Sequence, residues 1–177
     1  MKYTNRPPHI FQDESIYFLT ARTLNGNKYF DSDQKKEMIL SVLKSALSEF
    51  DFGIFAWVIL DNHYHLQVKV NRGIRLSDFV KKINGVSARN LNLLTNQTGR
   101  KVWWNYWDKC LATEKDFWVH FNYIHNNPIK HGYLSNLEQL AAYRFSSFSY
   151  YLKNKGKEWI DSIFTEYSII DFTLKDD

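Results

Sequence analysis

Residues 53–70, which read GIFAWVIL, then DN, then HYHLQVKV, decide the fold of this chain. Gly53 to Leu60 is a mostly apolar run, as expected of a buried strand. Asp61-Asn62 is a turn signal, because short amide and carboxylate side chains bond to their own backbone. His63 to Val70 alternates polar and apolar residues, which is typical of a half-buried strand. The stretch therefore predicts a β-hairpin.

The second strand of this hairpin separates its side chains onto two faces, because successive residues of a strand point to opposite sides. One face is apolar and aromatic and is expected in the core. The other is polar, and it carries His63, His65, Gln67 and Lys69. Two imidazoles roughly 7 Å apart at Cα can converge on one metal ion. An isolated pair of this kind also fits a solvated strand face, so the motif alone does not decide between the two.

The rest of the chain predicts strands and helices around the hairpin, from β-branched and aromatic runs and from helical spacing of apolar residues. Thr113 and Asp116 resemble a capping box, and Pro128 is expected to end the last helix. The order predicts an α+β fold of the ferredoxin-like type, with an antiparallel sheet and helices packed on one face. The segment after Gly132 is expected to pack on the sheet. Predicted strands are residues 16–23, 53–60, 63–70 and 102–112, and predicted helices are residues 31–50, a helix starting at Ser77, and residues 113–127.

Length and composition predict one globular domain over residues 1–177. A net charge of +4 is compatible with a polyanionic partner but is no proof of one.

The single cysteine, Cys110, excludes a multi-cysteine zinc site and favours a reducing compartment. No apolar run approaches the roughly 20 residues of a membrane span. The residues up to Asp13 lack the apolar stretch of a signal peptide. A cytoplasmic protein without membrane contact is expected.

The last predicted helix carries a polar stripe beside an apolar one, at about 100° per residue. Tyr123 and Asn127 lie one turn apart on the polar stripe and point the same way. They fit a catalytic pair, and equally a half-buried core tyrosine and a helix C-cap before proline. His120 also lies on this stripe and is expected to be a packing neighbour, and His125 lies on the opposite side of the helix.

Two blocks, WVILDNHYHLQV at residues 57–68 and FNYIHNNPIKHGY at residues 121–133, together resemble the HUH endonuclease superfamily. Within it, the chain is most similar to the REP-associated tyrosine transposases, which use one catalytic tyrosine. The resemblance extends over nearly the whole chain, including Thr20-Ala21-Arg22, residues 102–111 and residues 144–148. The family usually has Met-Pro-Asn before the first histidine, where this chain has Leu60-Asp61-Asn62.

The resemblance implies roles for four residues. It implies His63 and His65 as metal ligands, Asn127 as the third ligand and Tyr123 as the nucleophile. It further implies Mg²⁺ or Mn²⁺ and a 5′-phosphotyrosine intermediate on single-stranded or hairpin DNA. The expected enzyme is a metal-dependent endonuclease and transesterase, active in DNA transposition or REP processing. Members of this type occur as monomers and as homodimers.

Single-stranded DNA is usually held by basic side chains together with aromatic stacking. Candidate phosphate contacts are Arg22, Lys81, Lys82, Arg89 and Lys130, although each also fits a solvated surface charge. Candidate stacking residues are Trp103, Trp104 and Trp107, of which at least two are expected to be core residues. Two alternatives stay open at this stage. One is a non-catalytic nucleic-acid-binding module with a ferredoxin-like sheet, and the other is a metal-dependent hydrolase that uses water as its nucleophile.

Overall fold

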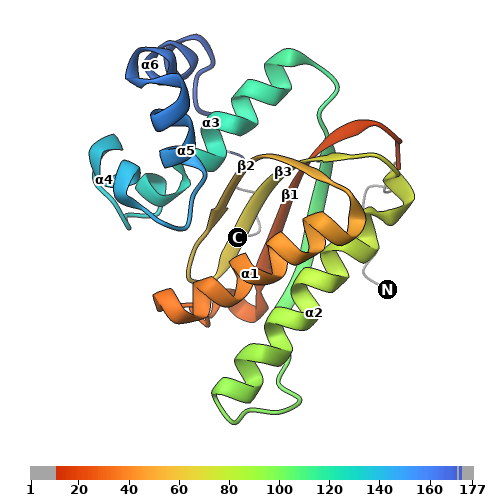
Figure 1. The fold of residues 1–177 in the computed structure, drawn as a ribbon. Coiled ribbons are helices and arrows are strands. Elements are labelled where there is room, and N and C mark those ends of the chain that lie inside the picture. The colour runs from red at the N-terminus through yellow and green to blue at the C-terminus, as the bar shows by residue number, and fades with distance from the viewer. Residues whose placement is uncertain (1–10, 171, 173–177) are drawn as a thin grey trace, which may run out of the picture.

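A four-stranded antiparallel sheet forms the centre of the computed structural model, which describes residues 11–170 and residue 172 (Figure 1). The strands lie in the order β2-β3-β1-β4, and every neighbouring pair is antiparallel. With one helix after β1 and one after β3, this arrangement confirms the predicted α+β fold of the ferredoxin-like type. The strands are β1 (Ser15–Thr23), β2 (Gly53–Ile59), β3 (His63–Val70) and β4 (Trp103–Cys110).

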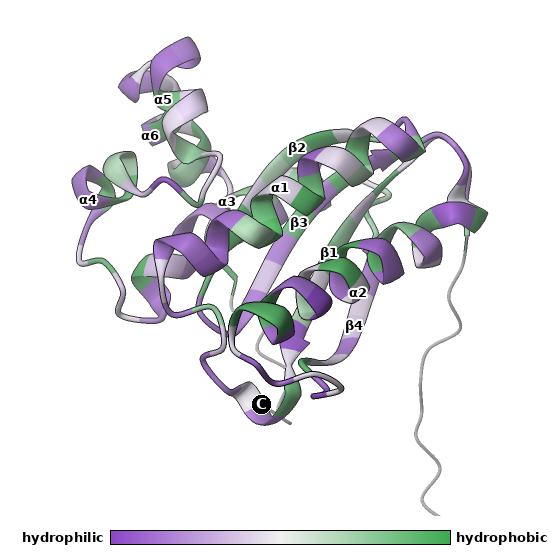
Figure 2. Ribbon diagram, turned by 60° about the horizontal axis from the view of Figure 1, so that its bottom comes forward, coloured by the Kyte–Doolittle hydropathy of each residue, from purple (hydrophilic) through white to green (hydrophobic). Residues whose placement is uncertain are grey.

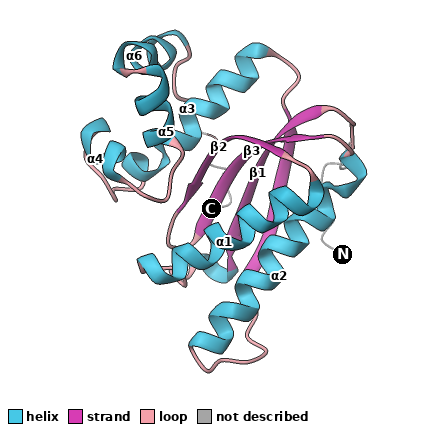
Figure 3. Cartoon of the chain, viewed as in Figure 1, coloured by secondary structure: helices cyan, strands magenta, loops and turns pink. Residues whose placement is uncertain are grey.

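The helices divide into three long ones that flank the sheet and three short ones that follow them (Figure 3). All predicted helices and strands are present, and no boundary is shifted by more than three residues. No helix in the described ranges is both long and apolar enough to cross a membrane. The helices are α1 (Asp33–Phe50), α2 (Leu76–Leu94), α3 (Glu114–Lys130), α4 (Leu137–Ala142), α5 (Phe148–Lys155) and α6 (Lys157–Glu166).

Helices α1 and α2 cover one face of the sheet and form the main core with it. Tyr64 and Leu66 of β3 belong to this core, which confirms the predicted apolar face of that strand. Leu43 of α1 and Phe79 of α2 meet them from the helix layer. Both helices alternate between hydrophobic and hydrophilic residues along their length, as expected of helices with one buried side (Figure 2).

Helix α3 lies against the opposite face of the sheet. Its residues Phe121 and Ile124 pack on Ala56 and Val58 of β2. Helices α1 and α2 thus cover one face of the sheet, as predicted for the helices. Helix α3 differs, because it forms a layer on the other face. This position matters for function, because the polar face of β3, with His63 and His65, is the face that α3 covers.

The segment after Gly132 packs on the sheet, as predicted, and is also hydrogen-bonded to the edge strand β2. Phe145 belongs to the main core, and Ile163 packs with Ala56 and Val58 of β2 on the other face. Backbone hydrogen bonds join Phe145 and Ser147 to β2. Helices α4, α5 and α6 pack on one another and on α3.

The prediction that Pro128 ends the third helix is wrong, because α3 continues to Lys130. A proline in the last turn removes one hydrogen bond, to the carbonyl of the residue four positions earlier. The carbonyl of Pro128 itself still accepts from the backbone N–H groups of Tyr133 and Leu134, at 2.9 and 3.3 Å. The extra turn keeps Lys130 on the same helix as Tyr123.

Candidate active site

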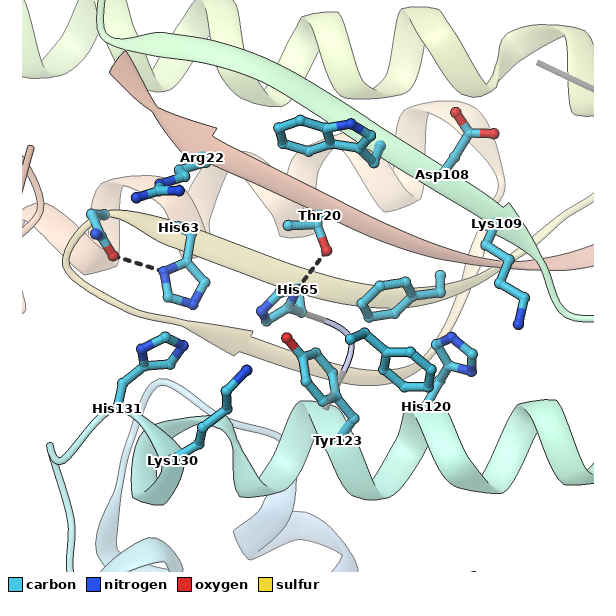
Figure 4. A pocket seen from close by; sticks show the side chains of 14 residues that line it. Thr20, Arg22, His63, His65, Asp108, Lys109, His120, Tyr123, Lys130 and His131 are labelled. Atoms are coloured by element: carbon cyan, nitrogen blue, oxygen red, sulfur yellow. Dashed lines mark hydrogen bonds between the residues drawn. The ribbon is translucent and has the colours of Figure 1, made fainter. Parts of the chain in front are cut away.

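A pocket of about 460 Å³ lies between the polar face of the sheet and α3 (Figure 4). Strands β1, β3 and β4 and helix α3 all contribute to its walls. It brings His63, His65 and Tyr123 together, three of the four residues with a predicted role in chemistry. Asn127, the fourth, lies buried beside it and contacts His63.

His65 is held in place from the neighbouring strand. Its cross-strand partner is Thr20 of β1, whose Oγ1 lies 2.6 Å from His65 Nδ1. Burial lowers the pKa of His65 well below its usual value, and the nearby His63 lowers it further, so the ring stays neutral. When the Nδ1 proton is donated to Thr20, Nε2 carries a lone pair. Nε2 is buried and finds no hydrogen-bond partner within residues 11–170 and 172, so a cation that bound there would satisfy this atom.

His63 has its proton position fixed by the turn that precedes it. The Asn62 side-chain amide donates from Nδ2 to the Gly26 carbonyl at 3.0 Å, which orients its oxygen toward His63. Asn62 Oδ1 then accepts from His63 Nδ1 at 2.7 Å. With the proton on Nδ1, Nε2 is the nitrogen whose lone pair can bind a metal.

Asn127 lies beside His63. Its Oδ1 is 2.9 Å from His63 Nε2, which is a hydrogen bond when Nε2 carries the imidazole proton. With the proton on Nδ1, the same two atoms both present lone pairs to one place, where a cation would bind both. In the part of the chain that the structure describes, no three His, Cys, Asp or Glu side chains gather into a metal cluster. The role of Asn127 as a third metal ligand, which the resemblance implied, stays a prediction.

Tyr123 points from α3 toward the two histidines (Figure 4). Its ring centroid lies 5.2 Å from that of His65, and the His63 and His65 centroids are 4.9 Å apart. Only 5% of Tyr123 is exposed. Lys130, two turns later on α3, places its Nζ 5.2 Å from the centre of the phenol ring. A phenol hydroxyl, two imidazoles and a positive charge thus share one pocket.

Several pocket residues were missed by the sequence reasoning. Thr20 and Asn62 support the imidazoles, but Thr20 can only be found once the register of β1 and β3 is known. His131, the residue after α3, packs its ring against His63 with centroids 4.9 Å apart. His120 is buried, and its Nδ1 lies 2.7 Å from the Asp116 carbonyl oxygen. Burial lowers the pKa of His120.

The five predicted phosphate contacts separate into two groups. Arg22 and Lys130 line the pocket. Lys81, Lys82 and Arg89 lie on α2, which covers the opposite face of the sheet, so the structure does not bring them to the pocket. Lys81 and Lys82 form ion pairs with Asp78 and Glu49. A contact between DNA and these three residues stays a prediction.

The three tryptophans of β4 take different positions. Trp103 is buried and stacks on Phe30, Trp104 is 57% exposed, and Trp107 lines the pocket. The expectation that at least two of them are core residues is therefore wrong, because β4 is an edge strand with only one fully covered face.

Known proteins similar to this chain agree with its fold. Residues 12–127 match the family model described as Transposase IS200 like. The chain is 26% identical over 134 residues to the REP-associated tyrosine transposase of Escherichia coli K12, covering 75% of each. A second curated relative, from Haemophilus influenzae, is 26% identical over 149 residues, which cover 78% of this chain and 82% of the relative.

Among solved structures, a REP-associated tyrosine transposase bound to a REP hairpin matches with a TM-score of 0.72 and 19% identity. The match covers 98% of this chain and 96% of that one. This match supports the fold, and the sequence matches support the family. Because the matched family region spans the hairpin, the histidine pair, Tyr123 and Asn127, the chain belongs to the IS200-like transposase family.

Proposed function

We propose that this chain is a single-strand-specific DNA endonuclease and transesterase that acts through a covalent phosphotyrosine at Tyr123. One observation carries the proposal. The Tyr123 ring packs directly on His65, while His63 Nε2 and Asn127 Oδ1 lie 2.9 Å apart beside the pocket. A core tyrosine would need no such neighbours, and these neighbours are what phosphoryl transfer requires.

The reaction is an exchange of phosphate esters. The Tyr123 oxygen attacks the scissile phosphorus, the bond from phosphorus to the 3′-oxygen breaks, and a 5′-phosphotyrosine and a free 3′-hydroxyl result. The proton lost by the phenol is balanced by the proton gained at the 3′-oxygen. The number of phosphate ester bonds is unchanged, so rejoining to another 3′-hydroxyl needs no ATP.

His63, His65 and Asn127 would hold a divalent cation, Mg²⁺ or Mn²⁺, which when bound supplies positive charge to the phosphate oxygens. Thr20 and Asn62 fix the ring orientation of the two histidines. Imidazole ligands favour Mn²⁺ over Mg²⁺. Lys130 adds a positive charge beside the phenol, at the place where the phosphate must arrive.

The proposed substrate is a DNA hairpin with an adjacent single strand. This part of the proposal is supported by the structurally similar protein, which is bound to a REP hairpin. The pocket is large enough for a nucleotide but not for a double helix, so the reacting strand must be single.

A denaturing gel tests the proposal. The wild-type chain, incubated with a 3′-end-labelled hairpin oligonucleotide and Mn²⁺, should form a covalent protein–DNA band, because the tyrosine stays on the 5′-phosphate of the fragment that carries the label. Tyr123→Phe should abolish the band, whereas Tyr150→Phe, a change at an exposed tyrosine of α5, should leave it intact. An adduct in the Tyr123→Phe variant would refute the assignment.

The same gel separates the two alternatives. Cleavage without any adduct would indicate a hydrolase in which water attacks the phosphate. Binding without cleavage, together with unchanged Mn²⁺ affinity in His65→Ala, would indicate a non-catalytic nucleic-acid-binding module.

A further inference from the structure

The pocket extends beyond Tyr123 toward β4. The residues of this extension take no part in the proposed reaction. Figure 4 shows Lys130 and His131 at one end and Lys109 at the other, with Tyr123 between them. The end near Lys109 is aromatic rather than polar. Phe18 of β1 and His120 of α3 form its walls, with ring centroids 4.8 Å apart.

A row of rings connects this aromatic end to the histidine pair. The His63 and His65 centroids are 4.9 Å apart, and Phe18 stacks on His65 at 5.5 Å with an interplanar angle of 17°. His120 continues the row. The notch between Phe18, His120 and Tyr123 therefore lies next to the position proposed for the scissile phosphate.

The notch already holds one planar ring, which belongs to Phe172. This ring lies parallel to His120, with centroids 4.3 Å apart and an interplanar angle of 10°. It meets Tyr123 at 5.1 Å and Phe18 at 6.4 Å. A flat ring that stacks face to face on His120 and touches two further rings shows which ligand shape fits the notch.

We propose that this notch is a nucleobase subsite, which stacks an unpaired base of single-stranded DNA beside the reacting phosphate. The inference rests on the proposed function and names a contact that helps to hold the substrate. Stacking on aromatic side chains accepts any base, because every base has a flat face. Lys109 and Lys130 line the same pocket on either side of Tyr123. Lys109 is paired with Asp116 at 2.8 Å, so Lys130 is the better placed of the two to contact a flanking phosphate. A base stacked on His120 must take the place of Phe172.

A binding experiment isolates the contribution of the bases. The full chain with Tyr123→Phe, which keeps the ring and prevents cleavage, is titrated with a 12-nucleotide dT strand and with a 12-nucleotide abasic strand. Both strands carry the same phosphates. The dT strand should bind roughly 5- to 150-fold more tightly, the range for one stacked base.

Phe18→Leu combined with His120→Gln should reduce this ratio at least fivefold and leave affinity for the abasic strand unchanged. Tyr150→Leu is the matched control, because Tyr150 is exposed on α5 and lies outside the pocket lining. An unchanged ratio in the folded double variant would refute the subsite, as would a dT strand that binds no better than the abasic strand.

Phe172→Ala provides a second measurement that does not alter the walls. It should tighten binding of the dT strand and not of the abasic strand, because it empties the notch. If it lowers only thermal stability and leaves the ratio of the two affinities unchanged, the subsite is refuted. A dT strand with one central 2-aminopurine should also lose fluorescence on binding, and no loss would count against stacking.

The outcomes distinguish this inference from the proposed function. If the wild-type chain forms the covalent adduct but binds the dT and abasic strands equally, only the base subsite is refuted. If it binds the dT strand more tightly but forms no adduct, only the phosphotyrosine reaction is refuted.

Discussion

Asn127 is the residue on which the metal proposal depends most. An amide oxygen is a weak metal ligand, so it contributes to metal binding only when it is held close to the other ligands. It is fully buried, and its Oδ1 lies 2.9 Å from His63 Nε2. Its Nδ2 finds no hydrogen-bond partner among the residues that the structure describes. A divalent cation would bind the amide oxygen, which is the atom that faces His63.

Asn127→Ala should weaken Mn²⁺ binding about tenfold or more, because one of three protein ligands is lost. Asn126→Ala is the matched control, since Asn126 is the preceding residue on α3 and is half-buried. Electron paramagnetic resonance of free Mn²⁺ measures the affinity without any need for activity. Equal affinities for the two variants would show that Asn127 is not a ligand.

At the scale of elements, α3 must be pressed against the sheet for Tyr123 to reach the histidines. Asn122 contributes to this from the far side of the helix. It is completely buried and donates from Nδ2 to the carbonyls of Ile163 and Tyr167, at 2.9 and 2.6 Å. One side chain thus ties α3 to the end of α6.

Asn122→Ala should lower the free energy of unfolding by about 2 kcal/mol, because two buried carbonyls lose their donor. Urea denaturation measures the loss. Amide hydrogen exchange should accelerate in α6 more than in β3. Helix α6 loses its hydrogen bonds to Asn122, while the hydrogen bonds between the strands of the sheet are unchanged. Uniformly faster exchange in both elements would mean that Asn122 supports the whole fold rather than this one contact.

A second link between elements is Tyr151 of α5, whose hydroxyl donates to the Phe55 carbonyl of β2. Burial raises the pKa of Tyr151 to about 12, above its usual value near 10. The protonated form is thus favoured in the folded state. Its contribution to stability is complete below pH 10 and is lost as the pH rises from 10 to 12.

In Tyr151→Phe, the loss of stability between pH 10 and pH 12 should therefore be smaller than in the wild type. The difference in slope is at most about 1.4 kcal/mol per pH unit, and less because the ring is partly exposed. Thermal unfolding at several pH values measures it. Tyr150→Phe, at an exposed position, should keep the wild-type slope. Parallel curves for wild type and Tyr151→Phe would contradict the assigned pKa.

The elements themselves could be predicted from sequence, because each is set by local patterns. Alternation in residues 63–70 and helical spacing near Tyr123 place His63, His65, Tyr123 and Asn127 on the right faces. The pairing of Thr20 with His65 depends on strand register, and Phe172 reaches the pocket from the far end of the chain. Such contacts form between segments distant in sequence, so no local pattern contains them.

The whole molecule presents basic side chains on two opposite sides of the sheet, and this decides which of them a single strand can reach. Arg22 and Lys130 line the pocket, whereas Lys81, Lys82 and Arg89 belong to α2 on the other side. A short single strand that enters the pocket cannot also cross to α2. A longer hairpin has a stem that can contact either side.

Salt dependence separates these two sides. For a single strand, each phosphate contact contributes about −0.7 to the slope of log K against log salt. With a 12-nucleotide single strand, Arg22→Met combined with Lys130→Met should flatten that slope by about 1.4, since two contacts are lost. Replacing Lys81, Lys82 and Arg89 by glutamine should leave it unchanged. Fluorescence anisotropy at four salt concentrations measures both. If the α2 variant flattened the slope and the pocket variant did not, the strand would have to bind on the opposite face of the sheet, far from Tyr123.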